Sequence, residues 1–261
     1  MLSAADINKI NYDFYCELKN LFELSKRIKE SYFISSLLLI DFLPERDANR
    51  KIIKGNIKFI PYFIYYLAAE SLSTIDCLSN IKVDNIKHKI KLTLLTFCHY
   101  LEMDFYYSLI ANLIRLLVDR IYTGPCLQGQ TLSVKMDSLE QLFSKLEMNL
   151  KVSMNTVKNE LCNDKLESIR NAFSHSKYYI QKDKLFLIDP AMGLPKKPYD
   201  FTYIDDLLKL RTVFLITFYQ VYEEFLSSYM DGNEYEAGIF KGGPLTMMIY
   251  YQRDRFISKN R

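Results

Sequence analysis

Arg170 and His175, which stand five residues apart, are the two side chains in this sequence best suited to chemistry. Histidine has an unperturbed pKa of about 6.5, so its neutral ring can take a proton from a ribose 2′-hydroxyl at neutral pH. Arginine stays charged and presents a fork of N–H donors to phosphate oxygens, where it stabilises the charge that builds on the phosphorus centre. The pair predicts cleavage of an RNA phosphodiester bond without a metal ion.

The sequence contains no pattern typical of a metal site. Its five cysteines and three histidines are scattered, and no two cysteines have CxxC spacing. A structural zinc site needs ligands clustered a few residues apart, so we expect neither a metal nor another cofactor. The odd number and wide spacing of the cysteines also give no disulfide framework, which favours the reducing cytoplasm.

The elements around the pair must bring its two side chains together. Periodicity predicts one helix over residues 154–173. On a continuous helix Arg170 and His175 would point about 140° apart and would not meet. The helix should therefore end near Ser174, whose hydroxyl can bond to the backbone, or the two groups should meet across a dimer.

The rest of the chain also has mainly helical periodicity, with a substantial apolar fraction of 49% and few glycines and prolines. Predicted helices cover residues 3–43 (one broken helix or two), 58–78, 86–122, 136–150, 154–173 and 203–230. Two short β-favouring runs at 178–181 and 185–188 predict a hairpin, and the three prolines in 189–200 predict a loop. Pro44 should end the first helical region.

These elements predict an all-α chain, built as a helical bundle with one small β-hairpin. We expect three parts: a helical N-terminal extension over 1–82, a bundle over 86–230 and a basic, looser C-terminal segment over 231–261. From residue 238 onward, five basic residues stand against one acidic residue, which gives this tail +4 and leaves −1 for the rest of a chain of net charge +3. A basic tail could hold phosphates, and a solvated, frayed terminus explains it equally.

Membrane insertion is not expected. The longest apolar stretches, 33–43 and 59–69, are short of the roughly 20 residues that span a bilayer. Asp6 and Asn8 interrupt the place where a signal peptide would be apolar. The sequence thus predicts a soluble, cytoplasmic protein.

A polar line continues the apolar stripe of the long helix over 86–122. It runs through Asp104, Ser108, Asn112, Arg115 and Asp119 at helical spacing. A solvated face with an ion pair explains this line, and so does a line of polar groups that reaches into a cleft. The supporting or substrate-binding candidates are Asp104 and Arg115, followed by Glu102 and Asn112. His99, beside the apolar stripe, is expected to be a semi-buried histidine, and His88 a solvated one.

The residues of the motif read Arg170-Asn171-Ala172-Phe173-Ser174-His175. This run resembles the signature of the HEPN superfamily, and its Arg-Asn-Ala-x-x-His form before a hairpin is similar to families of toxin–antitoxin and phage-defence loci. The resemblance covers about residues 86–230. It implies a four-helix core that forms a homodimer, with both motifs lining one RNA cleft, and products with 2′,3′-cyclic phosphate and 5′-hydroxyl ends.

By the same resemblance, Arg170 and His175 are the catalytic pair and Asn171 is their polar assistant. A possible antitoxin or regulatory protein is implied as a further partner. Tyr178 and neighbouring aromatic residues could stack on bases beside the site.

Three functions remain open from the sequence. The first is an endoribonuclease that acts as a toxin or phage-defence effector. The second is a non-catalytic HEPN-like module for dimerisation or for binding a nucleotide or a partner. The third is a structural helical adaptor in which residues 170–175 match the motif by chance, because short motifs often do.

Overall fold

The chain is mainly helical. The computed structural model describes residues 2–37, 41–46, 52–58, 86–122, 126–189, 192–196, 198–229, 233–239, 243–252 and 255–259. The helices are α1 (Ala4–Ile28), α2 (Glu30–Leu37), α4 (Ile86–Glu102), α5 (Asp104–Val118), α6 (Leu132–Leu150), α7 (Asn155–Leu161), α8 (Asp164–Ser174) and α9 (Phe201–Leu226). The predicted all-α class is confirmed, and none of the described helices is long and apolar enough to cross a membrane.

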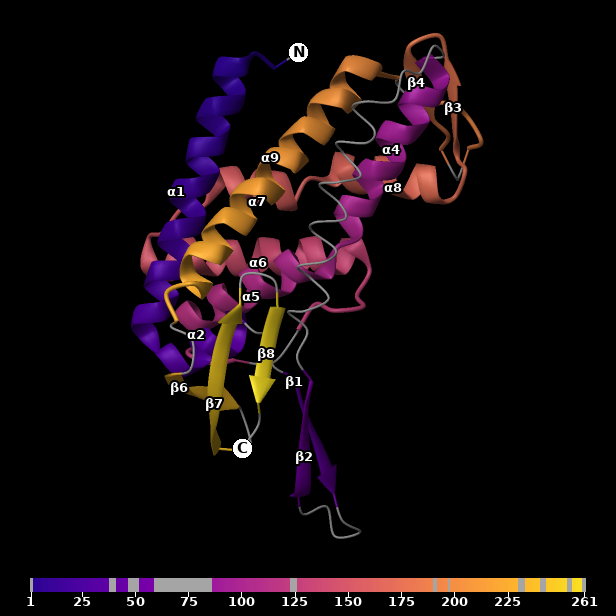
Figure 1. Ribbon diagram of the computed structural model, residues 1–261. Coiled ribbons are helices and arrows are strands. Elements are labelled where there is room, and N and C mark those ends of the chain that lie inside the picture. The colour runs from indigo at the N-terminus through magenta and orange to yellow at the C-terminus, as the bar shows by residue number, and fades with distance from the viewer. Residues whose placement is uncertain are drawn as a thin grey trace.

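The core lies between α1, α5 and α9. Figure 1 shows α1 and α9 side by side, with α5, α6 and α7 behind them in this view. Phe14 and Phe22 on α1 meet Phe214 and Phe218 on α9 as edge-to-face ring pairs, with centroids 5.4 and 6.4 Å apart. Such pairs add to the stability that burial of apolar surface provides. The first helix of the chain is therefore packed into the same core as the bundle.

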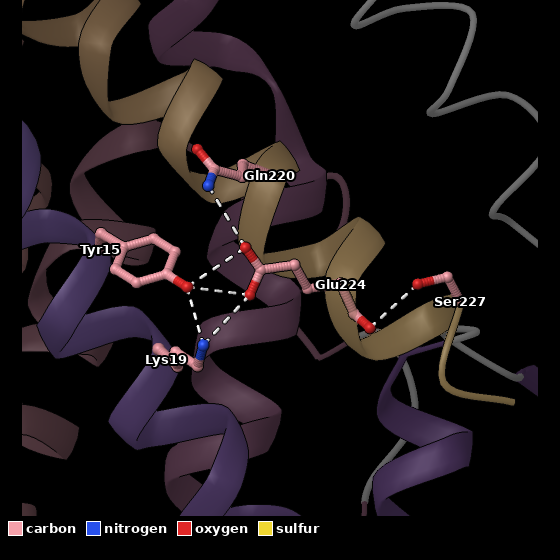
Figure 2. A network of polar contacts seen from close by, with 5 residues as sticks. All are labelled: Tyr15, Lys19, Gln220, Glu224 and Ser227. Atoms are coloured by element: carbon pink, nitrogen blue, oxygen red, sulfur yellow. Dashed lines mark hydrogen bonds and ion pairs between the residues drawn. The ribbon is translucent and has the colours of Figure 1, made fainter.

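A polar network joins α1 to α9 at the edge of this core (Figure 2). The hydroxyl of Tyr15 donates to the two carboxylate oxygens of Glu224 over 3.2 and 3.1 Å. Lys19 donates to Tyr15 over 2.8 Å and lies 3.4 Å from Glu224. These contacts fix the register of the two helices at the point where their apolar faces meet water.

The predicted helix over 86–122 is divided into α4 and α5 at Met103, whose backbone is extended. Hydrophobic periodicity could not show this break, because both halves are rich in buried residues. The predicted helix over 154–173 is likewise divided into α7 and α8. There, the side chain of Asn163 accepts a hydrogen bond from the amide of Lys165 and so caps the start of α8.

The predicted hairpin is confirmed as β3 (Tyr178–Gln181) and β4 (Lys184–Leu187), which pair antiparallel. The rings of Tyr179 and Phe186 stack across it with centroids 4.7 Å apart. A short third strand, β5 (Tyr199–Asp200), pairs with β4 within the stretch predicted as a loop. This small sheet follows α8 directly and leads back to α9.

One segment differs from its predicted structure, and another lies almost wholly outside the described residues. β1 (Asp41–Arg46) and β2 (Ile52–Lys58) form an antiparallel pair where the first predicted helix should reach residue 43. Pro44 lies within β1, in a two-stranded sheet where each strand is an edge and proline is tolerated. The predicted helix over 58–78 lies outside the described residues, except for its first residue, which belongs to β2.

The C-terminal segment is a three-stranded antiparallel sheet and not a loose tail. Its strands are β6 (Asn233–Ile239), β7 (Gly243–Gln252) and β8 (Arg255–Lys259). Residues 246–251 read Thr-Met-Met-Ile-Tyr-Tyr, a composition with high strand propensity that the basic charge of the tail obscured.

Candidate functional site

Arg170 on α8 is held by acceptors on two helices. Its Nε and Nη2 donate to Oε1 of Glu102 on α4 over 2.8 and 2.6 Å, and its Nη1 donates to Oδ1 of Asn171 over 2.9 Å. Three of the five N–H donors of a guanidinium are thus engaged, which leaves one on each terminal nitrogen. The Arg170 side chain is 25% exposed, so these two donors lie on a group that is oriented and still partly open to solvent.

Asn171 is itself fixed by a further contact. Its side-chain nitrogen donates to the carboxylate of Glu167, one turn earlier on α8, over 3.2 Å. The amide is therefore oriented with its oxygen toward Arg170.

The end of α8 determines where His175 lies. The amides of Ser176 and Lys177 bond to the carbonyls of Phe173 and Ala172, and Ser176 has a φ of 54°. These two hydrogen bonds, together with the left-handed conformation of Ser176, form a Schellman motif at the C-terminal end of α8. The prediction that the helix ends near Ser174 is confirmed, although backbone bonds and not the serine hydroxyl cause it.

His175 follows the last residue of α8 and is exposed. Its backbone amide donates to the carbonyl of Asn171 over 3.1 Å. Among the described residues, its ring forms no hydrogen bond or ion pair, with Arg170 or with any other group. Within one chain, then, the arginine is oriented and the histidine is free to meet a ligand.

A buried lysine fixes the α4–α5 junction, from which Glu102 extends. Lys135 on α6 is only 4% exposed, and its ammonium forms an ion pair with Asp104 and a hydrogen bond of 3.3 Å to the carbonyl of Glu102. The other carboxylate oxygen of Asp104 accepts from the amide of Gly129 over 2.8 Å. Asp104 thus lies beside the site but bonds inward, as a support for the junction. Sequence reasoning missed Lys135, because a lysine on an amphipathic helix is normally solvated.

Cys98 lies close to Arg170 and Glu102, and Tyr178 lies close to Cys98. Burial, with the charge of Glu102, raises the pKa of the Cys98 thiol to about 12, against the opposing effect of Arg170. The thiol is therefore neutral at physiological pH. The ring of Tyr178 stacks on Phe173 with centroids 5.4 Å apart, and burial raises the pKa of its hydroxyl.

The structure does not place the other candidate residues, Asn112, Arg115 and Ser174, beside the guanidinium of Arg170. Asn112 is fully buried and accepts a hydrogen bond from the thiol of Cys126 over 3.4 Å. It lies about 12 Å along α5 from Asp104, and Arg115 lies about 16 Å along. Ser174 is exposed at the end of α8. Along the polar line of α5, Ser108 and Asn112 are buried, Asp104 and Arg115 are half-buried, and Asp119 is exposed.

His99 differs from its prediction, because it is exposed on α4 and not semi-buried. It stands three residues before Glu102. The spacing between these two residues was the available signal, since three residues on a helix return to the same face.

A second charged pair lies inside the bundle. Arg211 on α9 is completely buried, with its Nε 2.9 Å from Oε1 of Glu160 on α7 and its Nη2 donating to the Glu160 carbonyl over 2.7 Å. Burial raises the pKa of Glu160 to about 7, although Arg211 opposes this shift. The guanidinium of Arg211 lies over the rings of Tyr106 and Phe214, and the Glu160 side chain is 9% exposed.

No three His, Cys, Asp or Glu side chains in the described part of the chain are grouped so that they could hold a metal ion. Comparisons with protein-family models, with curated proteins and with solved structures found no match to this chain.

Proposed function

We propose that this chain is a metal-independent endoribonuclease with Arg170 and His175 as its catalytic pair. One observation carries the proposal. Glu102 and Asn171 orient the guanidinium of Arg170 and leave two N–H donors unused, and the helix ends so that His175 is exposed five residues later. An oriented, partly exposed arginine and an unengaged histidine are groups that suit phosphodiester chemistry.

The proposed reaction proceeds by attack of the ribose 2′-oxygen. The neutral ring of His175 takes the proton of the 2′-hydroxyl as the new O2′–P bond forms. The two remaining N–H donors of Arg170 bind the non-bridging phosphate oxygens and stabilise the negative charge that builds on them. The P–O5′ bond breaks, and the products carry a 2′,3′-cyclic phosphate and a 5′-hydroxyl.

The proposed active form is a homodimer with a composite site. Among the described residues, Arg170 and His175 of one chain form no hydrogen bond or ion pair with each other, so the second copy can supply the complementary half of the pair. Together with the resemblance to the HEPN superfamily, this supports a toxin or phage-defence effector that acts on RNA in the cytoplasm, with an antitoxin or regulatory protein as its inhibitor.

A substrate series tests the proposed reaction. Mixed RNA is incubated with the protein and EDTA, and one cleaved sequence is then synthesised with a single 2′-deoxy residue at the cut. We expect cleavage of the all-ribose strand only, with cyclic-phosphate ends. Cleavage of the 2′-deoxy strand at the same position would overturn 2′-oxygen attack. Tight binding of RNA or nucleotide without cleavage would favour the non-catalytic binding module.

A further inference from the structure

His99 lies on α4 beside the residue that orients the arginine. His99 and Glu102 are three residues apart, and both are exposed. Cys98, on the inner face of the same helix, is buried. Residues with this spacing are neighbours on one helix face, with Cβ atoms about 5–6 Å apart. His99 therefore shares the solvent-facing side of α4 with the carboxylate that holds Arg170.

The ion pair between Glu102 and Arg170 joins two packed helices, each of which has an exposed histidine. The Nη2 of Arg170 lies 2.6 Å from the Glu102 carboxylate, and α4 packs against α8. His99 precedes Glu102 by about 4.5 Å of helix rise, and His175 follows Arg170 by about 7.5 Å. His99 is thus about one turn from Glu102, and His175 is about one and a half turns from Arg170.

Cleavage by the 2′-oxygen requires two proton transfers. The 2′-hydroxyl loses a proton as the O2′–P bond forms, and the 5′-oxygen gains one as the P–O5′ bond breaks. One imidazole cannot accept and donate in the same step, so an efficient site contains a second acid–base group. The proposed function gives the first transfer to His175 and leaves the second without a donor.

We infer that His99 is this second catalytic residue and, in its protonated form, gives a proton to the departing 5′-oxygen. The inference rests on the proposed ribonuclease function. At the end of the step His175 holds the proton of the 2′-hydroxyl and His99 is neutral, so the protons balance. His88 is the only other histidine of the chain, and it lies about 16 Å before His99 along the same face of α4.

A sulfur leaving group provides the test. An RNA strand that the wild type cleaves is synthesised with sulfur in place of the 5′-bridging oxygen at the cut, because a thiolate departs without a proton. We expect His99→Gln to slow cleavage of the oxygen strand by roughly 10²- to 10⁴-fold, the usual contribution of a general acid. On the sulfur strand the same variant should cleave at nearly the wild-type rate.

Two further variants complete the design. His175→Gln should remain slow on both strands, because the base is still required, and His88→Gln should match the wild type on both. The ratio of sulfur to oxygen rates is measured on one preparation of each variant, so it does not depend on the fraction of folded protein.

Two results would overturn the assignment of His99. One is wild-type cleavage of the oxygen strand by His99→Gln. The other is a loss of activity that the sulfur strand does not restore, which would indicate a structural role. Failure of the wild type to cleave any RNA, so that no such strand is found, would overturn the ribonuclease proposal itself, and the assignment with it.

Discussion

The orientation of Arg170 depends on two acceptors that differ in origin. Asn171 is its neighbour in the chain, whereas Glu102 comes from another helix and takes two of its N–H groups through one oxygen. A carboxylate in this position can hold the guanidinium ready for phosphate, or it can compete with phosphate for the same charge. The two remaining N–H donors favour the first role, because a non-bridging oxygen can bind there without displacing Glu102.

Replacement of Glu102 by alanine distinguishes these roles. We expect Glu102→Ala to lower the cleavage rate by roughly 10- to 100-fold, because a misplaced catalytic group loses about that much. The measurement is the rate on a fixed RNA substrate, beside Glu147→Ala, which removes an exposed glutamate from α6 as a control. A faster rate in Glu102→Ala would show that the carboxylate inhibits the site.

The end of α8 places His175, and it does so at some conformational cost. Ser176 occupies the left-handed position of the Schellman end, with a φ of 54°. Glycine is the usual residue there, because the left-handed conformation costs other residues about 1–2 kcal/mol. The geometry of the motif thus depends on backbone bonds that override the preference of the residue.

Replacement of Ser174 and of Ser176 by glycine should change the free energy of unfolding in opposite directions. Ser176→Gly should raise the free energy of unfolding by about 1 kcal/mol, because it relieves the left-handed residue. Ser174→Gly should lower it by about 0.5 kcal/mol, because glycine is a poorer helix former than serine. Urea unfolding measures both values, and a shift of the same sign in the two variants would contradict this description of the helix end.

The sequence was sufficient to predict most helices, the hairpin and the end of α8 near Ser174, because each leaves a local pattern. It was not sufficient for the break at Met103, where the apolar periodicity continues, or for the buried position of Lys135. Both depend on contacts between segments far apart in the chain. The same reason explains the candidate site: Arg170 and His175 form a local motif, whereas the Glu102–Arg170 ion pair joins residues 68 positions apart.

The buried Glu160–Arg211 pair inside the bundle makes the free energy of unfolding depend on pH. Glu160 and Arg211 join α7 to α9 in a buried position. Because burial raises the pKa of Glu160 to about 7 from 4.5, the folded protein keeps the proton at pH values where the unfolded chain has lost it. The folded state therefore binds more protons in this range, and its stability falls as pH rises from about 4.5 through 7.

Glu160→Gln should remove this dependence on pH. We expect the variant to match the wild type near pH 5, where the folded wild type keeps Glu160 neutral, and to be the more stable of the two above about pH 7, where the wild type holds a buried carboxylate. Its free energy of unfolding should lack the fall through neutral pH that the wild type shows. Urea unfolding at several pH values between about 5 and 9 compares the two slopes, and equal slopes would assign the dependence to other groups.

The proposed dimer predicts complementation between two inactive variants. Arg170→Ala and His175→Ala each lose activity alone, but a mixed dimer holds one site with both residues intact. If subunits exchange at random, half of the dimers in an equal mixture are mixed dimers, and each of these has one intact site of two. The mixture should therefore recover about one quarter of wild-type activity. Measurement of RNA cleavage after co-refolding tests this, and no recovery by a mixture that forms dimers would show that each site lies within one chain.

Cleavage of mixed RNA in the presence of EDTA, by the wild type and by His175→Ala, tests the ribonuclease proposal most directly. We expect the wild type to produce fragments with 2′,3′-cyclic phosphate ends. The rate should fall by at least 10²-fold in His175→Ala and remain unchanged in His88→Ala. Full cleavage by a well-folded His175→Ala protein, or wild-type cleavage that EDTA abolishes, would contradict the proposed site.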